Sequence, residues 1–240
     1  EVAKGEETCQ AIERIEAKTL LGCIYEDAAA IGFHYLRRGE WEKASAYLER
    51  AIPRYRDRNN LAALSSCTFV LGALRLEQDD LPGAEELLLK SLEMSSGGGN
   101  VLIELWVRPA LCELGIRMGQ PGRAAEHLER GLALLQPDKN WYGTPAPILR
   151  AQGLLAGARA KWDEAERSFE QAAAISRQYL LPWDEARALY DWALMHEVRD
   201  QRGDRKSADE KLGGALDIFE RIGARKDAEK VLARKEALKP

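Results

Sequence analysis

Few residues in this chain have the types and spacing that a chemical site requires. The histidines lie far apart, outside the His-x-x-x-His and His-Glu-x-x-His spacings that hold zinc on a helix: His34, His127 and His196. The cysteines are also widely separated, with no Cys-x-x-Cys pair: Cys9, Cys23, Cys67 and Cys112. We therefore expect no metal site and no redox motif, and we expect reduced thiols that pack as small apolar groups.

Motifs for phosphate binding and nucleophilic catalysis are missing from the sequence. The run Gly97 to Gly99 lacks the lysine and the preceding strand of a phosphate-binding loop, so it predicts a flexible linker. No Gly-x-Ser-x-Gly motif of a serine nucleophile is present. Adjacent acids such as Asp79 and Asp80 point in different directions and indicate solvated surface. We predict a protein that is not an enzyme and that has no cofactor.

The elements that would position any site are encoded by a repeat, of which Lys161 to Ile175 is the clearest copy. As a helix, this stretch places Ala165, Phe169 and Ala172 on one apolar stripe, which needs a partner helix to cover it. The anchor alanines of five such copies are 40, 40, 41 and 43 residues apart: Ala44, Ala84, Ala124, Ala165 and Ala208. This period, without strand signals, predicts an α-solenoid in which Ala165 lies at a close helix contact.

The repeat predicts five pairs of helices, each with a first (A) and a second (B) helix. The pairs are expected at about 19–56, 60–95, 100–136, 145–180 and 182–223, after a helix at 1–18 and before a capping helix at 224–240. Pro109 lies well inside the third A helix, and we expect it to kink or restart that helix because proline lacks an N–H. We interpret 1–240 as a single superhelical domain and, from its ends at Glu1 and Pro240, as a fragment of a larger protein.

The anchor positions resemble the tetratricopeptide repeat family. On the family's thirty-four-residue motif, the matches are Gly32, Tyr35, Ala44 and Ala51 in the first repeat, Gly72 and Ala84 in the second, Gly153, Ala165, Phe169 and Ala172 in the fourth, and Trp192, Ala208 and Ala215 in the fifth. The third repeat is the poorest match, with Cys112 and Gly131 at small-residue positions. The resemblance implies an all-α, right-handed α-solenoid of about five helix pairs with flanking capping helices.

A narrower likeness extends over nearly the whole chain, on loose motifs. Its motifs are Leu105-Trp106-Val107-Arg108-Pro109, Asn140-Trp141-Tyr142-Gly143, Leu181-Pro182-Trp183-Asp184-Glu185-Ala186 and Ile218-Phe219-Glu220-Arg221-Ile222-Gly223-Ala224. Together they look like C-terminal repeat regions of large bacterial signalling proteins that carry an AAA- or STAND-type ATPase with a nucleotide cyclase or a LuxR-type domain. This likeness implies a regulatory or scaffolding role and brings no catalytic residues.

Composition limits the classes of partner. The net charge of −4 and the pI near 5.6 give no electrostatic reason to expect nucleic acid, which usually requires a basic patch. No apolar run approaches the roughly 20 residues that span a bilayer, and no basic and apolar leader opens the sequence. We therefore expect a cytoplasmic protein without membrane contact, and the sequence leaves its oligomeric state open.

The resemblance implies a binding groove on the inner, concave face of the A helices. The residues expected there are Glu26, Phe33, Arg37, Phe69, Trp106, Arg108, Glu113, Arg117, Arg150, Leu154, Tyr190 and Glu197. Aromatic rings among charges are typical of a recognition surface, and the alternative is packing between helices. We expect Arg108 and Arg150 to recognise an anion, with a break at Pro109 turning Arg108 into the groove. The alternative is an internal salt bridge to Glu104, Glu113 or another acid.

Three functions remain open at this stage. The first is a non-catalytic module that binds a protein or peptide segment in the groove. The second is a small-molecule sensor that controls an attached ATPase or cyclase, and the third is a structural or dimerisation spacer. His196 stands where the repeat usually has a small residue, so we expect a packed or locally hydrogen-bonded histidine rather than a ligand.

Overall fold

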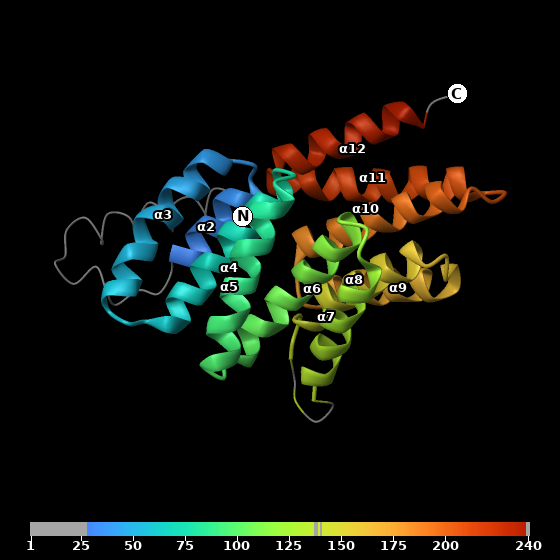
Figure 1. Cartoon of the computed structure of the whole chain (residues 1–240). Helices are drawn as coiled ribbons and strands as arrows, with labels where there is room; N and C mark the ends of the chain where they lie inside the picture. Colours follow the sequence, from blue (N-terminus) through green and yellow to red (C-terminus); the bar gives the residue numbers. More distant parts are fainter. Residues whose placement is uncertain (1–27, 137–138, 140, 239–240) are drawn as a thin grey trace. The chain divides into compact units, whose positions relative to one another are not determined.

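The computed structural model of this protein describes residues 28–136, 139 and 141–238, and these residues form eleven helices and no strand (Figure 1). The helices are α2 (Ala28–Arg37), α3 (Trp41–Asp57), α4 (Leu61–Glu77), α5 (Leu81–Gly97), α6 (Val101–Arg117), α7 (Pro121–Leu134), α8 (Pro145–Ala158), α9 (Trp162–Gln178), α10 (Pro182–Arg199), α11 (Asp204–Ile222) and α12 (Arg225–Ala237). The predicted all-α fold class is confirmed. The expected helix at 1–18 and the start of the first A helix lie outside the described residues.

Consecutive helices pair as the repeat predicts. Helix α2 packs on α3, α4 on α5, α6 on α7, α8 on α9 and α10 on α11, and α12 follows as a cap on α11. The anchor alanines face these contacts, and Ala165 is fully buried. Within the part of the chain that is described, the fold is therefore a series of five helix pairs with a C-terminal cap, as in an α-solenoid. The handedness of the superhelix stays a prediction.

The expected restart of the helix at Pro109 is wrong. Helix α6 runs without interruption through Pro109, which is itself buried. Helix α11 begins at Asp204, because Gly203 takes a left-handed φ of 98° and turns the chain there. The glycine run is also less of a linker than expected: Gly97 ends α5, Gly98 caps it, and Gly99 turns the chain with a φ of 66°.

A left-handed residue closes helices at twenty-residue intervals. These residues are Gly39, Asn59, Asp79, Gly99 and Gly119, and then Ala160, Leu180 and Asp200. At the first of them the N–H of Glu40 donates to the carbonyl of Tyr35 at 2.9 Å, and the N–H of Gly39 donates to Leu36 at 2.9 Å. This is the Schellman arrangement, which satisfies the last carbonyls of a helix and reverses the chain. The period of the fold is therefore set by backbone geometry as well as by apolar residues.

Glycines of the A helices allow close approach of the B helices. A Cβ added to Gly32 would lie 2.6 Å from the Leu48 side chain, and one added to Gly153 would lie 2.8 Å from the Phe169 ring. These distances are too short for a carbon–carbon contact. The two glycines matched the repeat pattern in sequence, and the structure shows that a large residue sixteen positions later fills the space above each of them.

The chain divides into two compact units at Gly99 and Asn100. In the first unit, α2 packs against both α3 and α4, and α3 also contacts α4. The described part of the second unit has apolar clusters around Leu105, Leu128 and Ile148, around Phe169 and Met195, around Ala172 and Ala188, and around Leu212 and Phe219. A single domain over 1–240 stays a prediction, and each unit is described by itself below.

Candidate functional site

The A helices of the second unit share a buried network of ion pairs centred on Arg150. Helices α6, α8 and α10 pack side by side, which brings one face of each together. The Arg150 guanidinium on α8 donates to Glu113 of α6 at 2.8 Å and to Asp191 of α10 at 2.5 Å. One side chain therefore links three successive A helices. We call Glu113, Arg150, Arg187 and Asp191 the Arg150 network.

Arg187 extends the Arg150 network toward the C-terminal cap. Its guanidinium lies 3.4 Å from Glu113 and 3.9 Å from Asp227 of α12, and it stacks over the Trp183 ring with its carbon 5.1 Å from the ring centroid. The indole N–H of Trp183 donates to Asp227 at 3.0 Å. The cap is thus tied to α10 by polar contacts as well as by apolar packing.

Burial makes the charge balance of this network important. The side chains of Arg150 and Glu113 are each 13% exposed, and that of Asp191 is 9% exposed. Burial opposes the charge of Arg150, but the carboxylates of Asp191 and Glu113 outweigh that effect and raise the pKa of the guanidinium. Arg150 therefore stays charged, and its main contacts are internal. Hydrogen bonds to two acids fix its position between the helices.

The other groove residues expected in the second unit lie around this network. Arg117 is 3.9 Å from Glu113, and Trp106, on the same stripe of α6, is 37% exposed. Leu154 packs against the apolar cluster of Phe169 and Met195. Tyr190 is half-buried, and burial raises the pKa of its hydroxyl. Glu197 pairs with Arg234 of α12 at 2.7 Å.

Arg108 does not join Arg150, contrary to our expectation. Its guanidinium donates twice to Glu104, one turn earlier on α6, at 3.0 and 2.6 Å. Its side chain also lies beside α7, because a Cβ added to Gly131 would be 3.6 Å from the Arg108 Cβ. Because α6 is not broken at Pro109, residues 108 and 113 are separated by about 140° around one continuous helix. The internal salt bridge, which the sequence left open, is the arrangement found.

In the first unit the expected groove residues form a packed cluster. The rings of Phe33 and Phe69 stack with centroids 6.1 Å apart, and the Arg37 guanidinium carbon lies 4.4 Å over the Phe33 ring. Phe69 is only 7% exposed. Phe69 therefore takes part in packing between α2 and α4, which is the alternative that the sequence left open. Glu26 lies outside the described residues.

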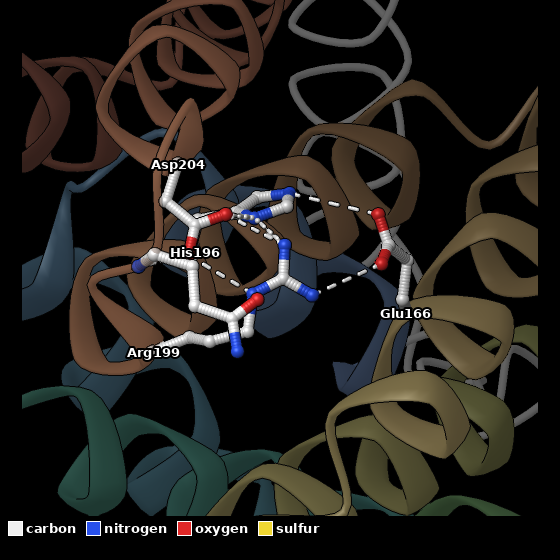
Figure 2. A network of polar contacts seen from close by, with 5 residues as sticks. Glu166, His196, Arg199 and Asp204 are labelled. Atoms are coloured by element: carbon white, nitrogen blue, oxygen red, sulfur yellow. Dashed lines mark hydrogen bonds and ion pairs between the residues drawn. The ribbon is translucent and has the colours of Figure 1, made fainter.

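A second polar cluster joins α9, α10 and α11 around His196 (Figure 2). The His196 Nδ1 lies 3.0 Å from the Asp204 carboxylate, and Arg199 donates to Asp204 at 2.9 and 2.6 Å. Arg199 also reaches Glu166 at 3.3 Å. Figure 2 shows the Arg199 guanidinium between the two carboxylates. The expected locally hydrogen-bonded histidine is confirmed, at 2% exposure.

Three residues of these polar contacts were not predicted from the sequence: Arg187, Asp191 and Asp227. Arg187 and Asp191 are one helical turn apart on α10, a spacing that places them on one face of a helix. That spacing was a usable signal. The partner on α8 could not be assigned in the same way, because 41 residues separate Arg150 from Asp191.

The described part of the chain was compared with three kinds of site: a reactive cysteine, a metal site and a membrane-spanning helix. Cys67 and Cys112 are buried, and burial raises the pKa of each thiol to about 12, so neither is a ready nucleophile. Among residues 28–136, 139 and 141–238, no group of three His, Cys, Asp or Glu side chains could hold a metal ion. In the same residues, no helix has the length and apolar character needed to cross a bilayer.

A protein-family comparison matches the part of the chain that holds the first two helix pairs. Residues 22–97 match the family described as tetratricopeptide repeat. This segment, 76 of the 240 residues, is similar to tetratricopeptide repeats. No match was found among curated protein sequences.

Solved structures share the fold of these repeats at low sequence identity. BtubC (BKLC) from P. vanneervenii is 17% identical, with a TM-score of 0.59 over 92% of this chain and 90% of that one. A Rap protein in complex with Competence and Sporulation Factor is 10% identical, with a TM-score of 0.60 over 89% and 63%. A putative kinesin light chain of TPR-like repeats from Podosopora anserina is 18% identical, with a TM-score of 0.51 over 80% and 93%. The likeness extends the fold beyond the segment that matches the family.

Proposed function

We propose that this chain is a non-catalytic module that binds a peptide or protein segment on the A-helix face of its second unit. The observation that carries the proposal is the bridge from Glu113 through Arg150 to Asp191, which fixes three A helices side by side. A surface built on rigid elements loses little entropy on binding. Around this rigid base, Arg117, Trp106 and Tyr190 keep exposed or half-exposed side chains.

The shared fold supports this proposal without identifying the partner. One structural neighbour, the Rap protein, was solved in complex with Competence and Sporulation Factor. Tetratricopeptide repeats commonly act as interaction scaffolds, and the loose sequence motifs given above resemble regulatory regions. We infer a regulatory or scaffolding role within a larger bacterial signalling protein, in which Arg150 holds the surface together and the half-exposed side chains contact the partner.

Selection of peptides from a displayed random library tests the proposal. We expect selected peptides to lose about tenfold or more in affinity for Tyr190→Ala and Arg117→Glu, because hot-spot aromatic and arginine side chains dominate interfaces. Arg130→Glu is the matched control, since Arg130 is exposed on α7, the B helix of the same unit. Circular dichroism checks that each variant stays folded. Peptides that bind both A-helix variants as well as wild type would refute the assignment.

One observation favours the alternative of a small-molecule sensor. A hollow of about 270 Å³ opens between α7, α8 and α9, and its lining includes the apolar side chains of Leu128, Leu132 and Leu155 and the charged residues Arg159 and Glu164. A metabolite library screened by thermal unfolding tests it, since a ligand at a hundred times its Kd stabilises by about 2.7 kcal/mol. Leu132→Trp, which fills the hollow, should abolish the stabilisation. Stabilisation that survives this change would place the ligand elsewhere.

A further inference from the structure

The outer side of α3, in the first unit, carries a line of three exposed arginines. Arg50 and Arg54 lie on the helix and Arg58 is its C-cap residue, with four residues between successive members. At 1.5 Å rise per residue the line extends over about 12 Å, and each step turns only about 40° around the helix. We call these three residues the α3 arginine stripe. Helix α3 is the B helix of its pair and belongs to the first unit.

The arginines of the stripe have no carboxylate partner within the described residues. Arg50 lies over the Tyr47 ring at 5.1 Å, and neither Arg54 nor Arg58 makes a side-chain ion pair among those residues. Like charges at this spacing destabilise a helix. The helix dipole favours cations at this end of the helix, which accounts for Arg54 in the last turn and for Arg58 at the C-cap. The Tyr47 ring accounts for the position of Arg50. These features leave the three guanidinium groups without a carboxylate among the described residues.

The same spacing occurs in α12, where the charges are neutralised. Lys226, Lys230 and Arg234 are also separated by four residues each. There, Lys226 pairs with Glu229 at 3.3 Å and Arg234 pairs with Glu197 at 2.7 Å. In α12, carboxylates of the chain itself therefore pair with basic residues that repeat every fourth position. The α3 arginine stripe differs because its partner must come from outside the described fold.

We propose that the α3 arginine stripe binds an acidic helix of a partner protein, one whose carboxylates repeat every fourth residue. Such a helix has the same rise between charges as the stripe, so three carboxylates can face three guanidinium groups. Arginine suits this role because its planar group holds a carboxylate through two parallel hydrogen bonds. This site is separate in sequence from the A-helix face of the second unit, for which a different protein or peptide segment is proposed.

Two features favour a protein helix over nucleic acid as the occupant. Exposed acids flank the stripe, Glu49 before it and Asp57 within it, and they would repel a phosphate backbone while pairing with basic residues of a partner helix. The stripe also has no exposed aromatic ring on which a base could stack, since Tyr47 and Tyr55 are 6% and 7% exposed. Base stacking is a major part of single-strand binding.

The test uses a synthetic, fluorescently labelled helical peptide of about 16 residues with glutamate at every fourth position. Binding to the whole chain is measured by fluorescence anisotropy at low salt, where surface charges are least screened. We expect saturable binding that Arg54→Glu weakens by about tenfold or more and that Arg54→Lys weakens less. Arg54→Glu replaces two like-charge pairs by two opposite-charge pairs but places an acid in the last turn, which the helix dipole opposes. Because the two effects offset each other, its melting temperature should stay close to that of wild type.

Matched controls separate the stripe from general charge. Arg130→Glu makes the same charge reversal at an exposed site of α7 and should leave binding unchanged. A peptide of the same composition with its glutamates moved to different faces should bind at least about tenfold more weakly. Equal binding of the two peptides, or equal binding to Arg54→Glu and wild type, would overturn the proposal.

Preferential binding of a different class of ligand would also contradict the proposal. The same variants are titrated with single-stranded oligouridylate and with vesicles of phosphatidylserine. Tighter, Arg54-dependent binding of either probe would overturn the protein-helix assignment in favour of that anion. The outcome is independent of the function proposed for the second unit, whose variants Tyr190→Ala and Arg117→Glu should bind the acidic peptide like wild type.

Discussion

At the scale of single residues, Arg150 links the helices on which the proposed binding face is built. Arg150→Ala would leave Glu113 and Asp191 largely buried without the cation between them. Removing one partner of a buried ion pair typically costs about 3–5 kcal/mol, because the remaining charge stays uncompensated. We expect that loss in the free energy of unfolding, measured by urea denaturation. Arg130→Ala, at an exposed site, should change it by less than about 0.5 kcal/mol, and equal midpoints for both variants would contradict this account.

The residues of the His196 cluster predict a dependence on acid. Hydrogen bonds from Arg199, from the backbone N–H of Gln201 and from His196 hold the pKa of the Asp204 carboxyl far below its usual range, although burial opposes them. A depressed pKa contributes stability above the ordinary value near 4, and this stability is lost as the pH falls further.

Asp204→Asn tests that dependence. At pH 7 the variant should lose about 3 kcal/mol of unfolding free energy, because Arg199 keeps its charge without the carboxylate. The difference from wild type should shrink as the pH falls below about 4, where the wild-type carboxylate begins to lose its contribution. Chemical denaturation at several pH values measures both. The control is Asp217→Asn on the exposed side of α11, and a constant gap between wild type and Asp204→Asn down to the lowest pH would refute the assignment.

At the scale of elements, close contact between paired helices depends on glycine where the partner is large. Gly153→Ala would place a methyl group 2.8 Å from the Phe169 ring. Overpacking of this kind costs about 1–3 kcal/mol, more than the roughly 1 kcal/mol that alanine gains in a helix. We therefore expect a lower denaturation midpoint. Phe169→Leu should partly restore the midpoint of Gly153→Ala, because the smaller side chain makes room.

An alanine substitution should instead increase stability at a helical glycine that has free space around it. The nearest atom to a Cβ at Gly213 of α11 is the flexible Lys235 Nζ at 3.8 Å, so Gly213→Ala should raise the free energy of unfolding by up to about 1 kcal/mol. If both glycine variants raised stability, helix propensity alone would explain them. The contact with Phe169 would then have no special role.

The sequence was informative about elements and less so about the site. Anchor alanines and turn residues act within about forty residues, and they located the helix pairs to within a few residues. The site depends on contacts between repeats: Arg150 meets Asp191 from 41 residues away, and no local pattern sets that pairing. The orientation of Arg108 was also not predictable from local sequence, because it depended on whether α6 continued through Pro109. Tertiary packing keeps the helix intact where proline alone would favour a break.

At the scale of the whole molecule, the arrangement of clusters predicts that the second unit folds by itself. Its apolar clusters and the Arg150 network are formed entirely by residues after Asn100. In repeat proteins, stability is approximately the sum of contributions from repeats and their nearest neighbours. A fragment of residues 100–240 should therefore keep a helical circular dichroism spectrum and unfold cooperatively in urea.

A shorter fragment provides the decisive comparison for this prediction. Residues 120–240 lack α6, so Ala124 and Leu128 of α7 lose the helix they pack against, and Arg150 loses Glu113. We expect this fragment to unfold at lower urea, because it exposes apolar surface and leaves the ion network incomplete. Equal midpoints for the two fragments would show that α6 does not stabilise the second unit. Failure of 100–240 to fold, with the full chain folding cooperatively, would instead support one domain over the whole chain, because α6 would then require the first unit beside it.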